Sequence, residues 1–123
     1  MFYQYEQAIQ ELAEYVKRRP EDVFGRNYLG YLNYQLKRYS ESVDQLQIAL
    51  KLRADNCYAY CLLSRAYGQL FLAAWALDPR RSQYRKSSLE MLQQAGATAT
   101  PNPRRIAWLT AWLRGNKILT EAK

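Results

Sequence analysis

The chain has 123 residues, of which 49% are hydrophobic and 24% charged, and it carries a formal net charge of +7. This length suits one domain and is too short for two separate cores, so we expect a single domain over residues 1–123. The chain has no histidine, the commonest general base, and Gly25-x4-Gly30 is followed by Tyr-Leu rather than by the Lys and Ser/Thr of a phosphate-binding loop. We therefore predict neither catalysis nor a cofactor.

Apolar residues recur at helical spacing along the chain, and helix-breaking residues separate the apolar runs. The breaks fall at Arg19-Pro20, Asp55-Asn56, Asp78-Pro79 and Pro101-Asn102-Pro103. In the last of these, Asn102 is placed to cap a helix and Pro103 to begin it. The pattern predicts an all-α protein of about six helices.

Residues 23–56 have the length of one helix–turn–helix unit, with small residues where its two helices would touch. Leu29-Gly30, then Ser42, then Leu46 and Ala49 follow the spacing W-x2-L-G-x2-Y, A-x3-F and A. The segment resembles a tetratricopeptide repeat. That resemblance implies an α-solenoid, in which antiparallel helix pairs stack into a right-handed superhelix. Arg26, Asn33 and Ala54 depart from it, because the family usually has Trp, Tyr and Pro there.

The pattern recurs on both sides of this unit. Upstream, Ala8, Leu12 and Pro20 precede Ser42, Leu46 and Ala54 by 34 residues. Downstream, the next unit has a first helix marked by Tyr60, Leu63, Ser64 and Tyr67 and a second, with Ser88, Leu92 and Ala95, that begins 12 residues late. We expect a half repeat at 1–22, a repeat at 23–56, a lengthened repeat at 57–102 and a terminal helix at 103–123. An ordinary helical bundle is the alternative.

In tetratricopeptide proteins, the first helices of successive repeats line a concave surface that binds a segment of another protein. The resemblance therefore implies a protein-binding adaptor, scaffold or chaperone-like module. The second, fifth, ninth and twelfth residues of each repeat are the groove positions. Here these are Phe24, Asn27, Tyr31, Tyr34, Tyr58, Cys61, Arg65, Gly68 and Arg104.

This set predicts an aromatic and basic groove. Tyr presents a large face at small entropic cost, and Arg binds acidic groups by charge-assisted hydrogen bonds. The expected guest is a peptide or amphipathic helix, with an acidic segment as one alternative. A family clamp for terminal carboxylates is not predicted, because Tyr31, Leu62 and Trp108 stand where polar clamp residues belong. Tyr39, Tyr60 and Tyr67 are expected in the core.

The basic excess is confined to residues 63–123, which contain 10 Lys/Arg and 3 Asp/Glu. The alternative function is therefore binding of nucleic acid or another polyanion. We also expect the helices around the 12-residue lengthening to run to about Leu77 and from about Ser82, as a projecting hairpin. Its tip would be a secondary contact site, or its two aromatic residues would staple the hairpin together. The site residues are Trp75, Arg80, Arg81, Tyr84 and Arg85.

Cys57 and Cys61 lie one helical turn apart, with too few other ligands for zinc, so we expect two reduced thiols and no metal site. The apolar run 57–77 is interrupted by Arg65, which favours a buried helix over a membrane span. With no leader at Met1, a cytoplasmic location is expected. Phe2, Tyr3 and Tyr5 suggest packing on another copy, continuation into a longer repeat protein, or packing on residues 23–36.

Overall fold

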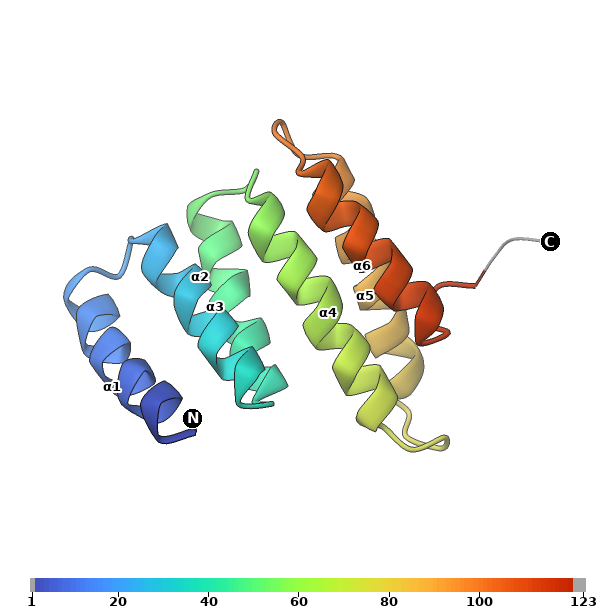
Figure 1. Cartoon of the computed structure of the whole chain (residues 1–123), viewed down its shortest axis with the longest axis horizontal. Helices are drawn as coiled ribbons and strands as arrows, with labels where there is room; N and C mark the ends of the chain where they lie inside the picture. Colours follow the sequence, from blue (N-terminus) through green and yellow to red (C-terminus); the bar gives the residue numbers. More distant parts are fainter. Residues whose placement is uncertain (1, 121–123) are drawn as a thin grey trace.

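The computed structural model describes residues 2–120, and within them it contains six α-helices and no strand. Consecutive helices are antiparallel neighbours along the chain (Figure 1). The helices are α1 (Phe2–Arg18), α2 (Val23–Gln35), α3 (Tyr39–Leu52), α4 (Cys57–Ala73), α5 (Arg81–Gly96) and α6 (Pro103–Gly115). The predicted all-α class and helix number are therefore confirmed.

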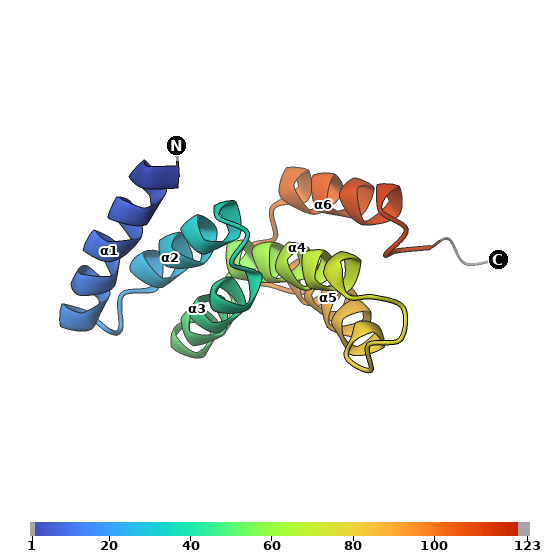
Figure 2. The same cartoon turned by 90° about the horizontal axis from the view of Figure 1, so that it is seen from below.

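The helices form two layers (Figure 2). Helices α2, α4 and α6 lie in one layer, α3 and α5 lie in the other, and α1 packs only against α2. Helix α4 contacts α2 and α6 within its own layer and both α3 and α5. This packing is consistent with a helical repeat, and it places the three helices that were expected to form the groove side by side.

The α2–α3 pair is held at close range by its small residues. A Cβ atom at Gly30 would lie 2.6 Å from Cγ of Leu46, so only glycine allows this approach. The Ser42 hydroxyl donates to the Gly30 carbonyl oxygen at 2.7 Å and is buried. The predicted contact between Gly30 and the second helix is therefore present.

The α4–α5 pair repeats this arrangement with two serines. The Ser64 hydroxyl donates to the Ser88 carbonyl oxygen at 2.7 Å, and the Ser88 hydroxyl donates to the Ser64 carbonyl oxygen at 2.7 Å. Both side chains are fully buried. Ser64 and Ser88 are the residues that the repeat pattern aligned with Gly30 and Ser42, so the two helix pairs make their closest contact at equivalent positions.

The three helices of the groove layer begin in the same way. Side-chain oxygens of Asp22, Asn56 and Asn102 accept backbone N–H bonds from Gly25, Ala59 and Arg105, at 3.0–3.1 Å. Each thereby satisfies one of the free N–H groups of a helix start. The N-cap that was predicted at Asn102 is confirmed.

Helices α2 and α6 also end alike. Lys37 and Lys117 have φ values of 61° and 60°, and the next N–H groups, of Arg38 and Ile118, donate to the carbonyls of Asn33 and Leu113. This is the usual left-handed termination of a helix. Start and end recur at the same interval, from position 22 to 102 and from 37 to 117. Helix α6 thus begins and ends as α2 does.

Two helix boundaries differ from the prediction. Helix α4 ends at Ala73 rather than near Leu77, because Ala74 is extended and Asp78 closes a turn onto the Trp75 carbonyl. The terminal helix, predicted over 103–123, ends at Gly115. Residues 121–123 of that predicted range lie outside the described residues. After α6, Ile118 turns back into the core.

The core has two parts on either side of α4. One lies between α3 and α4 and contains Leu46 and Leu63, and the other lies among α4, α5 and α6 and contains Leu109 and Leu113. Tyr39, Tyr60 and Tyr67 pack against these clusters, as expected. None of the described helices is both long and apolar enough to span a bilayer.

Candidate partner-binding groove

A pocket of about 440 Å³ lies among α2, α4 and α6. Helix α2 contributes one aromatic side chain, α4 forms the floor, and the first turns of α6 form the other wall. Five of the nine predicted groove residues line it, namely Tyr31, Tyr58, Cys61, Arg65 and Arg104. Asn56 and Asn102 cap the starts of α4 and α6. Residues from three helices that are far apart in the sequence thus line one pocket.

A second pocket, of about 500 Å³, continues from the first along α2. It is lined by Phe24 and Asn27, two more of the predicted residues, and it shares Tyr58, Asn102 and Arg105 with the first pocket. We call the two together the groove. The Asn56 amide donates to Asn27 Oδ1 at 3.0 Å, which ties the start of α4 to the middle of α2. Phe24 is 76% exposed, so this end offers an open aromatic face.

Arg65 is the central cation of the groove. Its guanidinium carbon lies 4.6 Å from the ring centroid of Tyr34 and 4.5 Å from that of Trp108, so the group is sandwiched between two aromatic faces. Such cation–π contacts hold a guanidinium group flat and in place. Its Nε atom is buried and has no hydrogen-bond partner. The two ring contacts therefore hold the side chain in position.

The rest of the first pocket is also cationic. Arg105 lies over the Tyr58 ring at 4.8 Å, and Arg104 is exposed at the rim. No carboxylate lines this pocket. In the second pocket Asp55 is bonded to Arg53 at 3.2 Å. Among residues 2–120, none of Arg65, Arg104 and Arg105 forms an ion pair.

Burial sets the chemistry of the groove floor. It raises the pKa of the Cys61 thiol to about 12, with a further contribution from neighbouring Cys57, so Cys61 offers a neutral thiol and not a nucleophile. Burial likewise raises the pKa of Tyr58, against the opposing effect of Arg105. Both cysteines are free and buried. Within the described residues, no three His, Cys, Asp or Glu side chains gather as metal ligands would.

Two residues assigned to the groove positions lie elsewhere. Tyr34 is only 6% exposed and packs in the α3–α4 core, where its hydroxyl accepts a bond from Gln69 at 3.1 Å. The expectation that Tyr34 lies outside the packing positions is therefore wrong. It supports Arg65 from below instead. Gly68 is buried, and a Cβ atom there would lie 2.8 Å from the Trp112 ring, so its role is to admit α6.

Arg105 and Trp108 both line the groove but were not among the predicted binding residues. Trp108 was considered only as a departure from the carboxylate clamp, and Arg104 was the one groove residue selected in this helix. Helical spacing was the available signal. Trp108 lies four residues after Arg104 and three after Arg105, so all three side chains lie on the same side of α6.

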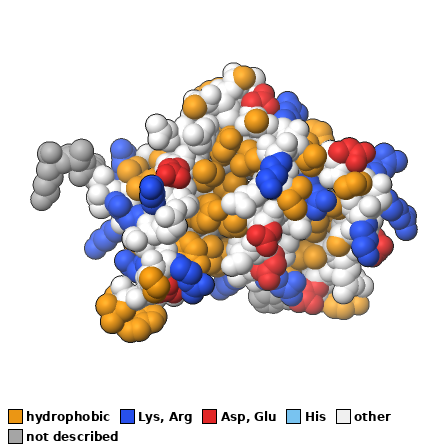
Figure 3. Space-filling model, turned by 180° about the vertical axis from the view of Figure 1, so that it is seen from behind, with side chains coloured by type: hydrophobic (Ala, Val, Ile, Leu, Met, Phe, Trp, Pro, Cys, Tyr) orange, Lys and Arg blue, Asp and Glu red, His pale blue; other side chains and the backbone are white. Residues whose placement is uncertain are grey.

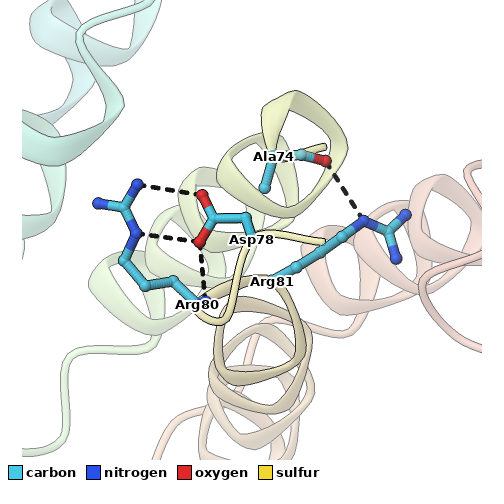
Figure 4. A network of polar contacts seen from close by, with 4 residues as sticks. All are labelled: Ala74, Asp78, Arg80 and Arg81. Atoms are coloured by element: carbon cyan, nitrogen blue, oxygen red, sulfur yellow. Dashed lines mark hydrogen bonds and ion pairs between the residues drawn. The ribbon is translucent and has the colours of Figure 1, made fainter. Parts of the chain in front are cut away.

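The predicted tip site is not assembled as one cluster. The Asp78 carboxylate accepts bonds from the Arg80 backbone N–H at 2.8 Å and from its guanidinium at 3.1 and 3.2 Å (Figure 4). Arg81 Nε donates to the Ala74 carbonyl at 3.3 Å, and its guanidinium lies over the buried Phe71 ring. These contacts leave fewer free cations for a polyanion.

The two aromatic residues of the tip diverge. Tyr84 packs against the core among α4, α5 and α6, under Arg80, whose guanidinium lies 6.0 Å from its ring centroid. Trp75 is exposed, so it does not staple the hairpin. Arg85 lies on the half-buried side of α5.

No protein-family model matches the chain, and no curated protein matches it in sequence.

Proposed function

We propose that this protein is a tetratricopeptide-like α-solenoid that binds a segment of a partner protein in the groove. The repeat assignment is supported by the equivalent close contacts of the two helix pairs and by the matching starts and ends of α2 and α6. The free, buried cysteines support a reducing compartment such as the cytoplasm.

The observation that carries the binding proposal is the arrangement around Arg65. Arg65 is a half-buried cation held against two rings, in a pocket with two more arginines and no carboxylate, and it forms no ion pair within the described residues. An acidic group on a guest restores the charge balance through charge-assisted hydrogen bonds.

The shape of the groove indicates a segment with apolar side chains beside the acidic one. The pocket around Arg65 continues past Tyr58 to the exposed ring of Phe24, so the groove is basic at one end and aromatic at the other. An amphipathic helix or an extended peptide with separated acidic and apolar residues matches this order.

Selection from a random peptide library tests the proposal. We expect the enriched peptides to carry Asp or Glu together with apolar residues, and calorimetry to show that Arg104→Glu weakens their binding roughly tenfold or more. Trp108→Ala removes one wall of the pocket and one support of Arg65, so it is expected to weaken binding similarly.

Lys17→Glu is the matched control, because it makes the same charge change at an exposed position on α1, outside both pockets. Circular dichroism establishes that each variant is folded. Selection that enriches no peptide sequence, or enriched peptides that bind the Arg104 and Lys17 variants equally, would reject the groove as the binding site.

Self-association through α1 is the second candidate. This helix packs only against α2, and Tyr3 is 71% exposed near its start. A dimer that dissociates on Tyr3→Glu substitution in sedimentation equilibrium would support it, whereas a monomer at the highest attainable concentration would exclude it.

A further inference from the structure

The loop between α4 and α5 presents bulky apolar side chains to solvent. Trp75 is 68% exposed and Leu77 76% exposed, and Leu72 at the end of α4 is 42% exposed. In Figure 3 a group of hydrophobic side chains projects from the body at the lower left, where the turned view of Figure 1 places this loop. We call residues 72–79 the tip. A cluster of this kind marks an interaction surface more often than a single exposed side chain does.

The exposure of the tip is built into the loop. Asp78 holds the Arg80 backbone and side chain, and Arg81 holds the Ala74 carbonyl (Figure 4). The Arg81 guanidinium also lies 4.0 Å from the centroid of the Phe71 ring and covers that ring. The loop is thereby fastened with its apolar side chains outward.

The surroundings of the tip are positively charged. The segment from Ala74 to Lys86 contains four Lys/Arg residues and one carboxylate, Asp78, which is paired with Arg80. In the part of the chain that the structure describes, Arg85 and Lys86 form no ion pair. Apolar side chains that project beside cations without ion-pair partners are suited to a negatively charged surface that is soft enough to admit them.

The positive charge around the tip also limits which kinds of partner can bind there. The groove of a second copy is itself lined by arginines, so it would repel the tip. An acidic protein would need a cavity complementary to two protruding side chains. A fluid bilayer needs no preformed cavity, since Trp partitions to the interface and Leu to the acyl boundary, while Lys and Arg are attracted to anionic headgroups.

We propose that the tip docks this protein onto the surface of an anionic lipid bilayer. Trp75 and Leu77 enter the interfacial region, and Arg85 and Lys86 lie at the level of the headgroups. Binding is peripheral, so the groove remains available to a partner. The proposal does not depend on the groove function, because no residue of the tip lines either pocket.

Vesicle flotation tests this docking. The full-length protein is expected to float with vesicles of mixed phosphatidylcholine and phosphatidylserine, much less with phosphatidylcholine alone, and progressively less as salt rises. The double variant Trp75→Ala/Leu77→Ala is expected to bind the mixed vesicles roughly tenfold or more weakly. Arg85→Glu/Lys86→Glu is expected to remove the preference for phosphatidylserine.

Leu52→Ala is the matched control, since it removes an exposed leucine from α3, away from the tip and outside both pockets. It is expected to float as the unaltered protein does. No flotation with the mixed vesicles at low salt, equal flotation of the tip and control variants, or equal binding to both kinds of vesicle would each overturn the proposal. Tip-dependent capture of a purified acidic protein without vesicle binding would assign the tip to a protein partner instead.

Discussion

Gly30→Ala tests the close contact on which the α2–α3 pair depends. The added Cβ would lie 2.6 Å from Cγ and 2.7 Å from Cδ2 of Leu46, distances that real Cβ atoms do not adopt. Leu46 is fully buried, so its side chain has no free space into which to move. The two helices must therefore separate, or Leu46 must leave its preferred rotamer.

We expect this overpacking to cost about 1–3 kcal/mol. Alanine is favoured over glycine in a helix by about 1 kcal/mol, which offsets part of the cost. The expected net result is a decrease of about 0–2 kcal/mol in the free energy of unfolding.

Urea denaturation followed by circular dichroism measures this change. Gly96→Ala is the matched control, because no atom lies within 4 Å of the position of its Cβ, and it is expected to leave stability unchanged or raise it. In the Leu46→Ala background the clash is absent, so Gly30→Ala there is expected to be neutral or stabilising. The cycle should show a coupling free energy of about 1–3 kcal/mol.

A gain in the free energy of unfolding for Gly30→Ala in the unaltered background, equal to that of Gly96→Ala, would refute the argument. So would a loss as large in the Leu46→Ala background as in the unaltered one, because the cost would then come from somewhere other than the contact with Leu46.

Two further predictions concern the second helix pair and the buried thiols. Ser64→Ala and Ser88→Ala are each expected to lower the free energy of unfolding by about 1 kcal/mol, as urea denaturation would measure, and an unchanged midpoint for both would contradict a role for the reciprocal hydrogen bonds. Burial is the main cause of the raised pKa of Cys61, so in a Cys57→Ala variant Cys61 is expected to react with iodoacetamide at pH 8 at least about tenfold more slowly when folded than in urea. Because the folded pKa is the higher one, the contribution of Cys61 to stability is complete below pH 9 and is lost as the pH rises through about 12, so thiol trapping at equal rates in both states would contradict this burial.

Much of the fold was predictable because it follows from local rules. The Pro and Asx residues that separate the apolar runs mark helix ends wherever they occur, and Asn102 caps its helix as predicted. Small residues at a repeat spacing indicated where helices approach, and Gly30, Ser42, Ser64 and Ser88 make those contacts. Repeat position also selected five residues that line one pocket.

The misplaced residues depend on partners distant in the sequence. Tyr34 was assigned to the groove by its repeat position, but the packing of α3 and α4 encloses it, and Gln69 supplies its hydrogen bond. Repeat spacing placed Trp108 at a clamp position, but its contact with the Arg65 guanidinium depends on how α6 packs against α4.

The sequence by itself determined the helices, their caps and the small residues that let them pair, because each depends on a few neighbouring residues or on a regular interval. Only the tertiary structure decided which tyrosines are enclosed, that Arg65 lies between Tyr34 and Trp108, and that Trp75 and Leu77 are held outward. These outcomes depend on how three or more elements meet in space, and the burial and charge environment of a side chain are set there.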